Sequence, residues 1–423
     1  MDTFLQKLKI IVTEKAIRDR VLFVLFAIVI FRMLTVVPIP GVDLAVLEQF
    51  FQNNAFLGLL NIFSGGGLSN LSIVMLGVGP FITASIIMQL MTVMSPQLKA
   101  MYSEEGETGR ARFTQYSRQL TLPLAILQAF GFLSLLKSQG VISGLTSFEF
   151  MVNIVIVVAG SMLLLWLGEL VTEYGIGNGV SIIIFAGIVS KLPHSIGQLW
   201  YNRDPSQIPL YFAFAAAAVA ITYAVVVMTQ AERQVPITHA KQVRGGKTYG
   251  GTTSYLPLRL NQAGVIPIIF ALSIILFPQM ILNILASFNV SGTAEWGARI
   301  TTFFQNPQLY AVVYFVLVFV FTFFYTAVTF DPDAMSKNLQ RTGAFIPGIR
   351  PGNHTAEYLG KLITRLTLAG ALFLGVIAIL PNVMQILTGI TTLAIGGTAL
   401  LIAVSVVIDL VRRVDSQVSL RQY

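Results

Sequence analysis

Apolar residues gather in ten long runs along this chain, and polar segments rich in charge, glycine or proline separate the runs. A helix of ~20 apolar residues is long enough to cross the hydrocarbon core of a bilayer. The pattern therefore predicts an all-α membrane protein with ten transmembrane helices. The predicted spans are 21–37, 72–92, 120–136, 150–172, 179–197, 209–229, 262–286, 309–330, 362–381 and 390–411.

A further apolar segment, 56–70, lies directly before the second span and is too short to cross the bilayer. It contains three consecutive glycines, Gly65, Gly66 and Gly67, which permit a sharp turn at little steric cost. Irregular backbone can lie at membrane depth only where protein or a water-filled cavity covers it. A half-span hinged against a full span indicates a channel or transporter with a re-entrant element.

The composition agrees with a membrane protein. Of the 423 residues, 55% are apolar and 11% are charged, whereas a soluble domain carries about 25% charged residues. The chain has no cysteine, which excludes disulfide and thiol chemistry. Its histidines, His194, His239 and His354, all lie between predicted spans and are too widely separated for a metal-ligand motif. We therefore expect no metal and no cofactor.

Lysine and arginine are distributed unevenly between the two sides of the predicted spans. The side that carries the N-terminus has 22 of the 27 basic residues, the opposite side has 4, and Arg32 lies within the first span. Cytoplasmic loops of membrane proteins are enriched in these residues, so both termini are expected in the cytoplasm. The net charge of +8 belongs to this face, and the positive-inside rule alone can explain it.

The ten spans divide into two groups of five. An odd number of spans in each half means that the halves, 1–200 and 201–423, would have inverted orientations, as in many transporters. The two longest cytoplasmic loops, 231–260 and 331–361, are polar and basic and contain turn residues. Since these loops are too long to be simple connectors, we expect them to form a docking surface for a cytoplasmic partner.

The predicted spans contain few ionisable residues. Secondary transporters usually place such residues at the bilayer midplane as ligands for ions or protons. Here Glu169 and Asp409 lie near cytoplasmic ends and Arg32 lies toward an outer end, where snorkelling or pairing explains each better than a proton relay. The chain also has no TVGYG-like selectivity filter, no nucleophile–base pair within the spans and no G-x-x-x-x-G-K-[ST] phosphate loop. These absences disfavour an ion channel and an enzyme.

Eight stretches, in order along the chain, are similar to segments of one family. They are FRMLTVVPIPGVD (31–43), NIFSGGGLSNLSIVMLGVGPFITASIIMQLMTV (61–93), EEGETGRARFTQYSR (104–118), WLGELVTEYGIGNGVSIIIFAGIV (166–189), LPLRLNQAGVIPIIFALSIILFP (256–278), TGAFIPGIRPG (342–352), TRLTLAGALF (364–373) and GGTALLI (396–402). From the first span to the C-terminus, the chain resembles the SecY family. The resemblance implies a channel that passes unfolded polypeptides across the bacterial cytoplasmic (inner) membrane and releases transmembrane segments sideways into lipid.

The family fold implies ten helices in two inverted five-helix halves around a central, hourglass-shaped pore. The segment 56–70 matches the plug, a short element that closes the external funnel in this family. The plug residues carried over by the resemblance are Leu57, Leu60, Ile62, Phe63, Ser64, Gly65 and Gly66.

The narrowest point of the family's pore is a ring of aliphatic side chains. Matched motif by motif, the ring residues are Val78, Ile82, Val180, Ile184, Ile269 and Ile402. Two of these are valine where isoleucine is common, which implies a slightly wider ring. An aliphatic constriction can fit around an extended chain without chemical preference, and it resists ion flow because it dewets when empty.

The resemblance also implies a lateral gate between the second and seventh spans, with the third and eighth spans beside them. We place the polar residues Thr83 and Gln128 at this gate. A local hydrogen bond between neighbouring helices is an equally good reading of both residues. A signal sequence would open the gate, since burial of its apolar residues can bias the equilibrium.

The cytoplasmic loops match the family's docking sites for the ribosome and for the motor ATPase SecA. Arg350 in PGIRPG corresponds to a functionally sensitive loop arginine, although bracing of its own loop is an alternative. In the earlier loop, Arg244 and Lys247 carry the charge, and Gly246 departs from a common pair of arginines. The family further implies the small subunits SecE and SecG as partners. The alternative from another class is a secondary transporter for a small solute.

Overall fold

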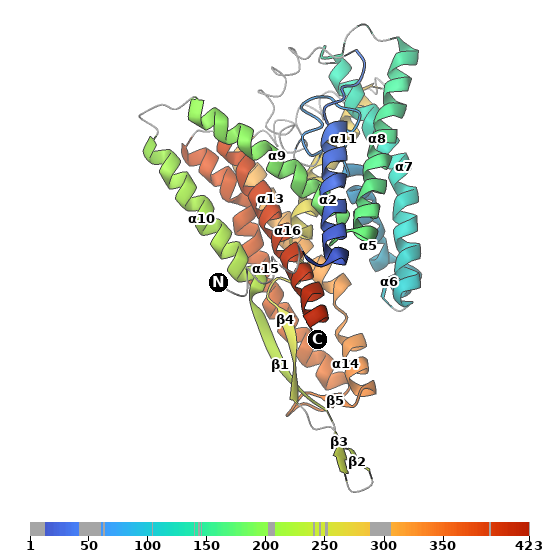
Figure 1. The fold of residues 1–423 in the computed structure, drawn as a ribbon, viewed down its shortest axis with the longest axis vertical. Helices are drawn as coiled ribbons and strands as arrows, with labels where there is room; N and C mark the ends of the chain where they lie inside the picture. The colour runs from blue at the N-terminus through green and yellow to red at the C-terminus, as the bar shows by residue number, and fades with distance from the viewer. Residues whose placement is uncertain are drawn as a thin grey trace.

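The computed structural model describes residues 13–41, 61, 64–103, 105–138, 140–142, 144, 146–201, 208–239, 242–244, 247–249, 253–287, 306–388 and 391–422. Helices dominate these residues and run roughly along one direction (Figure 1). The helices that coincide with predicted spans are α2 (Lys15–Leu34), α5 (Gly79–Met94), α7 (Gly106–Ser138), α8 (Ser147–Tyr174), α9 (Gly179–Tyr201), α10 (Ile208–Gln230), α11 (Ile266–Ser287), α13 (Pro307–Thr329), α15 (Asn353–Thr388) and α16 (Thr391–Gln422).

Each predicted span therefore falls on one helix. In the described part of the chain, α7, α8, α13 and α15 are each long and apolar enough to cross a membrane, and α5 would be a fifth if it is joined with α6 (Pro96–Ser103). Shorter apolar stretches lie in α9, α10 and α11. The mostly helical membrane-protein class agrees with the sequence, and the count of ten crossings stays a prediction.

The second span differs from the sequence prediction at both ends. Ser72 forms an isolated antiparallel bridge with Pro38, and residues 73–78 form consecutive turns rather than helix, with Gly77 at φ 58°, a conformation that favours glycine. At the other end Ser95 is extended and Pro96 follows, and the chain bends by 118° between α5 and α6. A residue before proline avoids the helical region, which explains the break.

The turn segment 71–78 is held by its neighbours rather than by helical hydrogen bonds. The Ser161 hydroxyl of α8 donates to the Gly77 carbonyl at 2.9 Å. Gly160 lets α8 approach closely, because a Cβ there would lie 2.0 Å from the Ile73 carbonyl oxygen. On the other side, the Ile73 amide donates to the Val37 carbonyl at 2.9 Å. Tertiary contacts thus override the apolar pattern that predicts helix here.

Short strands occupy the two long loops, which the sequence did not predict. Strand β1 (Glu232–His239) lies at the centre of a three-stranded antiparallel sheet, between β4 (Thr253–Arg259) and β5 (Ala344–Phe345). Strands β2 (Gln242–Arg244) and β3 (Lys247–Tyr249) form a separate hairpin. Because β5 follows α14 (Pro332–Arg341), the sheet joins the two loops into one body. Figure 1 shows this body beyond the helices, at one end of the molecule.

The buried apolar side chains form three main clusters within the helical part. One cluster joins α2, α8, α9 and α16, and a second joins α5, α10, α11, α13, α15 and α16. A third, in the N-terminal half, joins the 68–75 region to α7 and α8. Helix α16 contributes to both of the first two clusters, so it links the N-terminal helices to the C-terminal ones.

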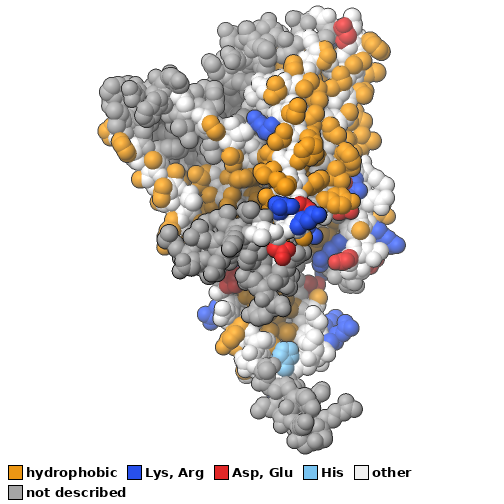
Figure 2. Space-filling view, viewed as in Figure 1, with side chains coloured by type: hydrophobic (Ala, Val, Ile, Leu, Met, Phe, Trp, Pro, Cys, Tyr) orange, Lys and Arg blue, Asp and Glu red, His pale blue; other side chains and the backbone are white. Residues whose placement is uncertain are grey.

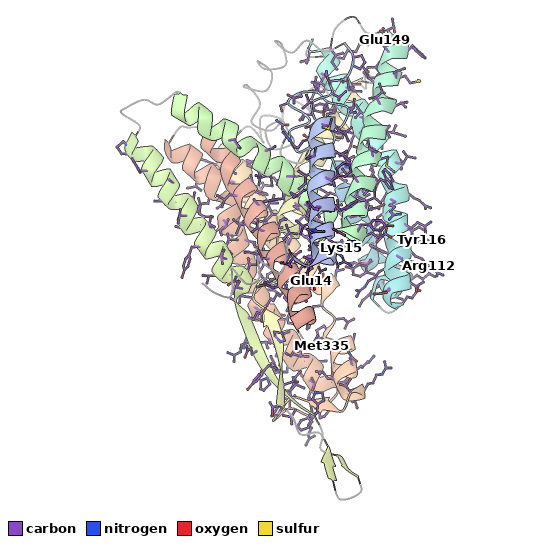
Figure 3. The ribbon with its side chains drawn as sticks, in the orientation of Figure 1. Glu14, Lys15, Arg112, Tyr116, Glu149 and Met335 are labelled. Atoms are coloured by element: carbon purple, nitrogen blue, oxygen red, sulfur yellow. The ribbon has the colours of Figure 1, made fainter. Side chains whose placement is uncertain are left out.

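Charged residues concentrate at the ends of the helices, while their sides are apolar (Figure 2). Figure 3 places Lys15 and Arg112 toward the end of the molecule that carries Met335, and Glu149 at the opposite end. The loops predicted to be cytoplasmic therefore lie together at one end. Exposed Leu25, Phe26 and Val155 illustrate the apolar belt between the ends, which suits contact with lipid tails.

Candidate functional site

The six predicted ring residues meet in one apolar cluster. Val78, Ile184 and Ile402 are at most 3% exposed and belong to its core. Ile82, Val180 and Ile269 are partly buried and pack against the same cluster. Four elements supply these side chains, since Val78 and Ile82 come from the start of α5 and the others from α9, α11 and α16. The structure thus brings together residues that are up to 324 positions apart in sequence (78 to 402).

Two members of this set lie at the boundary between clusters. Ile82 and Ile269 also pack against the second cluster, which is built mainly from the C-terminal helices. The cluster that contains all six residues is therefore continuous with both halves of the molecule. An aliphatic meeting point of this kind has no polar group to hold water or an ion.

Glycines position α9 for its part in the cluster. Gly179 begins α9, and a Cβ there would lie 1.9 Å from the Gly168 carbonyl oxygen of α8. The Gly179 amide donates to the Thr172 hydroxyl at 2.9 Å. This contact fixes the first turn of α9 against α8, and Val180 and Ile184 follow on consecutive turns.

The described part of the plug segment is Asn61 and 64–70, while Leu57, Leu60, Ile62 and Phe63 lie outside the described residues. Its turns are closed by local hydrogen bonds. The Gly66 amide donates to the Asn61 carbonyl at 2.9 Å, and the Leu68 amide donates to the Ser64 hydroxyl at 3.0 Å. Ser64, Gly65 and Gly66 are buried, so the predicted plug residues that are described lie inside the helical body.

Two helices hold this segment directly. The Arg32 guanidinium of α2 donates through Nη1 to the Gly65 carbonyl at 2.9 Å. A Cβ on Gly187 of α9 would lie 2.2 Å from the Gly65 Cα, so the two backbones touch. Asn70 donates from Nδ2 to the Thr35 carbonyl at the C-terminus of α2, at 3.2 Å. The sequence left snorkelling and pairing open for Arg32, and it did not identify Gly65 as an acceptor.

Thr83 and Gln128 contact each other within the N-terminal half. Gln128 of α7 donates from Nε2 to the Thr83 hydroxyl of α5 at 3.4 Å, and that hydroxyl donates to the Gly79 carbonyl at 3.1 Å. This geometry is the local helix–helix hydrogen bond that the sequence left as an alternative. Their role at a lateral gate stays a prediction.

The seam between α5 and α11 is apolar. Ile82, Ile86 and Leu90 of α5 belong to or pack against the cluster that contains Ile268 and Ile275 of α11. Helix α11 also packs on α7, and α13 reaches α5. The second and seventh predicted spans are thus neighbours, with the third and eighth beside them.

Arg350 is exposed at the tip of a stiff turn. Gly348 and Gly352 adopt φ of 83° and 97°, conformations that other residues rarely take. The Thr355 hydroxyl donates to the Arg350 carbonyl at 3.0 Å, and the Ser336 hydroxyl donates to the Gly352 carbonyl at 2.7 Å. The backbone of Arg350 therefore braces the loop, and its side chain is presented to the surroundings.

Arg244 and Lys247 are paired positions in the backbone register of the β2–β3 hairpin. Gly246 lies outside the described residues. The hairpin extends away from the rest of the protein (Figure 1). Arg244 and Lys247 therefore lie on the separate hairpin, whereas Arg350 follows β5 of the three-stranded sheet.

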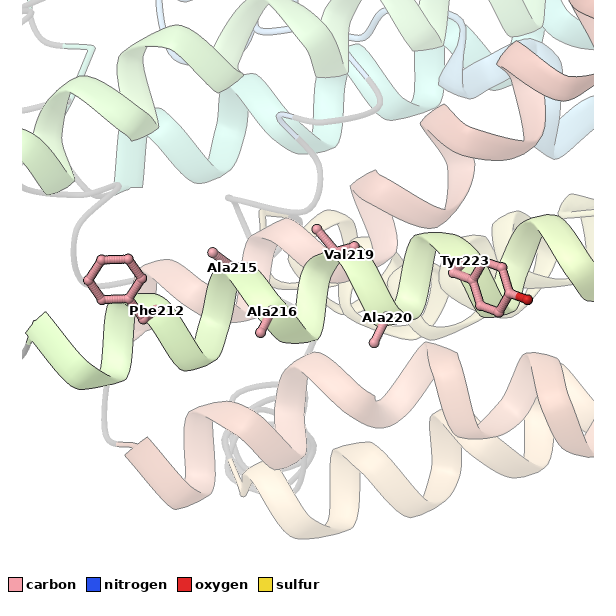
Figure 4. A pocket seen from close by; sticks show the side chains of 6 residues that line it. All are labelled: Phe212, Ala215, Ala216, Val219, Ala220 and Tyr223. Atoms are coloured by element: carbon pink, nitrogen blue, oxygen red, sulfur yellow. The ribbon is translucent and has the colours of Figure 1, made fainter.

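Two hollows lie on the surface of the helical part of the protein that the structure describes. One, of about 390 Å³, lies between the start of α9, the start of α11 and the middle of α16, and Asn261, Arg259 and Arg412 are among its lining residues. The other, of about 660 Å³, runs along the outside of α10 (Figure 4). Phe212, Ala215, Ala216, Val219, Ala220 and Tyr223 line it. Since its lining is apolar and belongs to one helix, it offers a surface for lipid or a helix rather than a chemical site.

Among the described residues, no group of three or more His, Cys, Asp or Glu could hold a metal ion.

Comparisons with known proteins agree with this arrangement. The SecY family model matches residues 72–411. The protein translocase subunit SecY of Escherichia coli K12 is 42% identical over 417 residues, covering 96% of this chain and 93% of the relative. The subunit from Mycobacterium tuberculosis H37Rv is 39% identical over 427 residues, with 96% of both chains covered. The chain belongs to the SecY family. Membership makes it a membrane protein of a translocase family, and the secondary-transporter alternative has no support among these relatives.

Solved structures share the fold at lower sequence identity. A protein-conducting channel superposes with a TM-score of 0.65 at 18% identity, covering 95% of this chain and 92% of its own. Sec61 from a canine ribosome–channel complex gives a TM-score of 0.62, also at 18% identity and with 95% and 92% covered. At this identity the likeness concerns the fold, and it places the SecY-type arrangement of helices on nearly the whole chain.

Proposed function

We propose that this protein is the channel subunit of a protein translocase, through which unfolded polypeptides cross the cytoplasmic membrane. One observation carries the proposal: six aliphatic side chains from four separate elements converge in a single cluster, with a buried turn segment beside them. Relatives of about 40% identity over nearly the full chain are protein translocase subunits. The two halves, 1–200 and 201–423, would move against each other about this constriction.

The chemistry of the constriction suits a polypeptide rather than a defined solute. A substrate-specific site needs a few placed polar groups, whereas the six side chains here are aliphatic. Aliphatic walls accept any side chain in turn, and they dewet when no chain is present. The plug segment 56–70 would complete the seal on the external side.

The apolar seam between α5 and α11 would open sideways to lipid. The Thr83–Gln128 hydrogen bond joins α5 to α7 on one side of the seam, so opening leaves it intact. What would separate is apolar packing within the cluster that contains Ile86 of α5 and Ile275 of α11. An apolar guest can replace such contact without leaving a polar group unpaired. Signal sequences and transmembrane segments offer surface of that kind.

The body built from β1, β4, β5 and α14 would dock cytoplasmic partners. The related Sec61 and Ssh1 channels have been solved with ribosomes. We propose the ribosome and the SecA motor as alternating occupants, with Arg350, Arg244 and Lys247 among the contacts. SecE and SecG would complete the membrane complex. The energy for transport would come from the motor, so the chain itself would have no enzymatic activity, and both termini would face the cytoplasm.

Reconstitution tests the proposal. The chain, purified with its small subunits, is placed in vesicles with SecA, ATP and a precursor protein that carries a signal sequence. Protease-protected precursor is the expected product. The proposed function is wrong if a complex that retains its subunits neither takes up the precursor nor inserts a transmembrane segment into the lipid.

Arg350 tests the docking surface in the same assay. The guanidinium is a planar fork of five donors, and lysine would keep the charge but lose the fork. We expect Arg350→Glu to abolish motor-driven uptake and Arg350→Lys to reduce it several-fold, with normal protein level and subunit association. Arg341→Glu is the matched control, because Arg341 is exposed in the last turn of α14 within the same body. Equal uptake by the Arg350 and Arg341 variants would mean that docking depends on other residues.

A further inference from the structure

We infer that Arg32 is a positioning residue that seats the plug segment, and that Gly65 is the part of that segment it holds. The inference rests on the proposed channel function and names a residue that controls the closed state. It is argued from a contact between α2 and the segment: Nη1 of Arg32, near the C-terminus of α2 and within the first predicted span, donates to the Gly65 carbonyl at 2.9 Å.

Without such a contact, burial of the Arg32 charge within a span would cost free energy. A charged side chain within a span must find polar partners, and those in membrane proteins commonly pair with backbone carbonyls. Gly65 lies in turns where its carbonyl is not used by a helix, so it needs a donor. A charge-assisted hydrogen bond is roughly twice as strong as a neutral one. Arg32 and Gly65 therefore satisfy each other, and the plug segment is tied to α2.

The seat around Gly65 fits only glycine. Gly65 has φ 65°, and a Cβ there would lie 2.2 Å from Cζ of Phe31, whose ring is fully buried. From the other side, a Cβ on Gly187 would lie 2.2 Å from the Gly65 Cα. The segment is thus clamped between the Phe31 ring of α2 and the backbone of α9, with the Arg32 guanidinium fixing its register.

The seat is connected to the constriction through α9. Gly187 follows the ring residue Ile184 by three positions, so both lie on one face of the helix. Ala186 and Ile188 belong to the same cluster as the ring residues. A movement of α9 that widens the ring would therefore also disturb the surface against which Gly65 rests. Conversely, a segment held at Gly65 resists that movement.

A thiol placed in the segment measures the seat without requiring transport. Ser64 is 2% exposed, and the chain has no cysteine of its own, so Ser64→Cys reports only on this position. In the purified complex, the rate of reaction with a small maleimide measures how often the segment leaves its seat. We expect slow labelling with Arg32 present, and labelling at least tenfold faster with Arg32→Met or Gly187→Ala. Arg32→Lys keeps the positive charge and one donor nitrogen, and it should restore most of the protection.

The control removes a charge without touching the segment. Lys137 lies in the last turn of α7 above the Phe150 ring, and Lys137→Met should label at the unmodified rate. Resting ion leak in planar bilayers should rise for the Arg32 and Gly187 variants and stay constant for the control. Arg32→Met and Gly187→Ala both act on one seat. The double variant should therefore raise the labelling rate by less than the product of the two single fold-increases.

The outcomes separate the inference from the proposed function. Labelling of Arg32→Met at the control rate, in a complex of normal abundance, overturns the inference even if uptake of precursor is normal. If Arg32→Met does not accumulate, Arg32→Gln takes its place with the same expectation, and an unchanged rate again overturns it. Absence of uptake by the unmodified complex, with a clear labelling difference, would refute the channel function and leave the seat standing.

Discussion

The sharpest test of the constriction is Ile402→Asn. Ile402 is 2% exposed and packs in the cluster that holds all six ring residues. An amide there has no partner among the aliphatic neighbours of the closed state, but it can be hydrated once the constriction opens. Burying an unpaired polar group costs roughly 1–3 kcal/mol in proteins. We take the lower end, ~1 kcal/mol, because water can reach a ring residue more easily than a core residue, and this corresponds to about a fivefold shift toward the open state.

Two measurements follow from that shift. Reconstituted complexes in planar bilayers should show a resting conductance about fivefold above that of the unmodified protein. Cells carrying the variant should also export a precursor with a weakened signal sequence, since less binding energy is then needed to open the channel. Ile402→Leu keeps an aliphatic side chain of the same size and should change neither property.

The neighbouring residue supplies a matched control. Leu401 is 1% exposed but packs in the other large cluster, with α11, α13 and α15. Leu401→Asn introduces the same amide one position away, so it should lower protein abundance or thermal stability without raising conductance. Equal conductance in the Ile402 and Leu401 variants would show that the effect is general core damage, and the assignment of the ring would be wrong.

Three further predictions concern topology and folding. Lys247→Cys should not react with an impermeant thiol reagent added to intact cells, because the hairpin is expected in the cytoplasm; rapid reaction would reverse the orientation. Thr146→Ala removes the N-cap of α8, whose hydroxyl accepts from the N3 amide at 3.3 Å, and should lower stability by about 1 kcal/mol in thermal unfolding. Gly160→Ala would place a Cβ 2.0 Å from the Ile73 carbonyl oxygen and should lower the melting temperature, whereas Gly197→Ala meets nothing within 4 Å and should be neutral or slightly stabilising.

The sequence predicts the helices well because the bilayer imposes a simple length rule. Each apolar run of sufficient length coincides with a helix. The rule fails at 72–78, where the residues are apolar but the backbone forms turns. Hydropathy reports burial rather than conformation, and what determines conformation there is contact with Gly160 and Ser161, about 85 residues later in the chain.

The strands were missed although their signal is present. In β1, Val235 and Ile237 are buried while Gln234 and Pro236 are exposed, the alternation expected of a half-buried strand. The polar and glycine-rich surroundings of the segment favoured reading it as an irregular loop. The short β5 has no comparable signal, because its pairing with Thr238 and His239 depends on bringing the two loops together.

The sequence likewise predicts one part of the candidate site and misses another. Family motifs placed six side chains that the structure gathers into one cluster, because the motifs stand at fixed positions on helices. They did not show that Thr83 and Gln128 bond to each other, or that Arg32 reaches Gly65. Both contacts depend on the distance in space between elements that are separated in sequence, and a single sequence contains no measure of that distance.

The distribution of polar contacts explains how one molecule can be both sealed and openable. Two hydrogen bonds between described helices, Gln128 to Thr83 and Arg412 to the Thr229 carbonyl, each lie within one half. The ion pair between Lys99 and Asp331 does cross between halves, at 3.7 Å, but the Lys99 side chain is 61% exposed and such surface pairs contribute only about 0–1 kcal/mol. Among the described residues, apolar side chains of α5 and α11 pack together in one cluster along the seam. Such contact can be lost without leaving unpaired polar groups, and an apolar helix between α5 and α11 would restore most of it. We therefore expect the substrate itself to supply the free energy that opens the proposed gate.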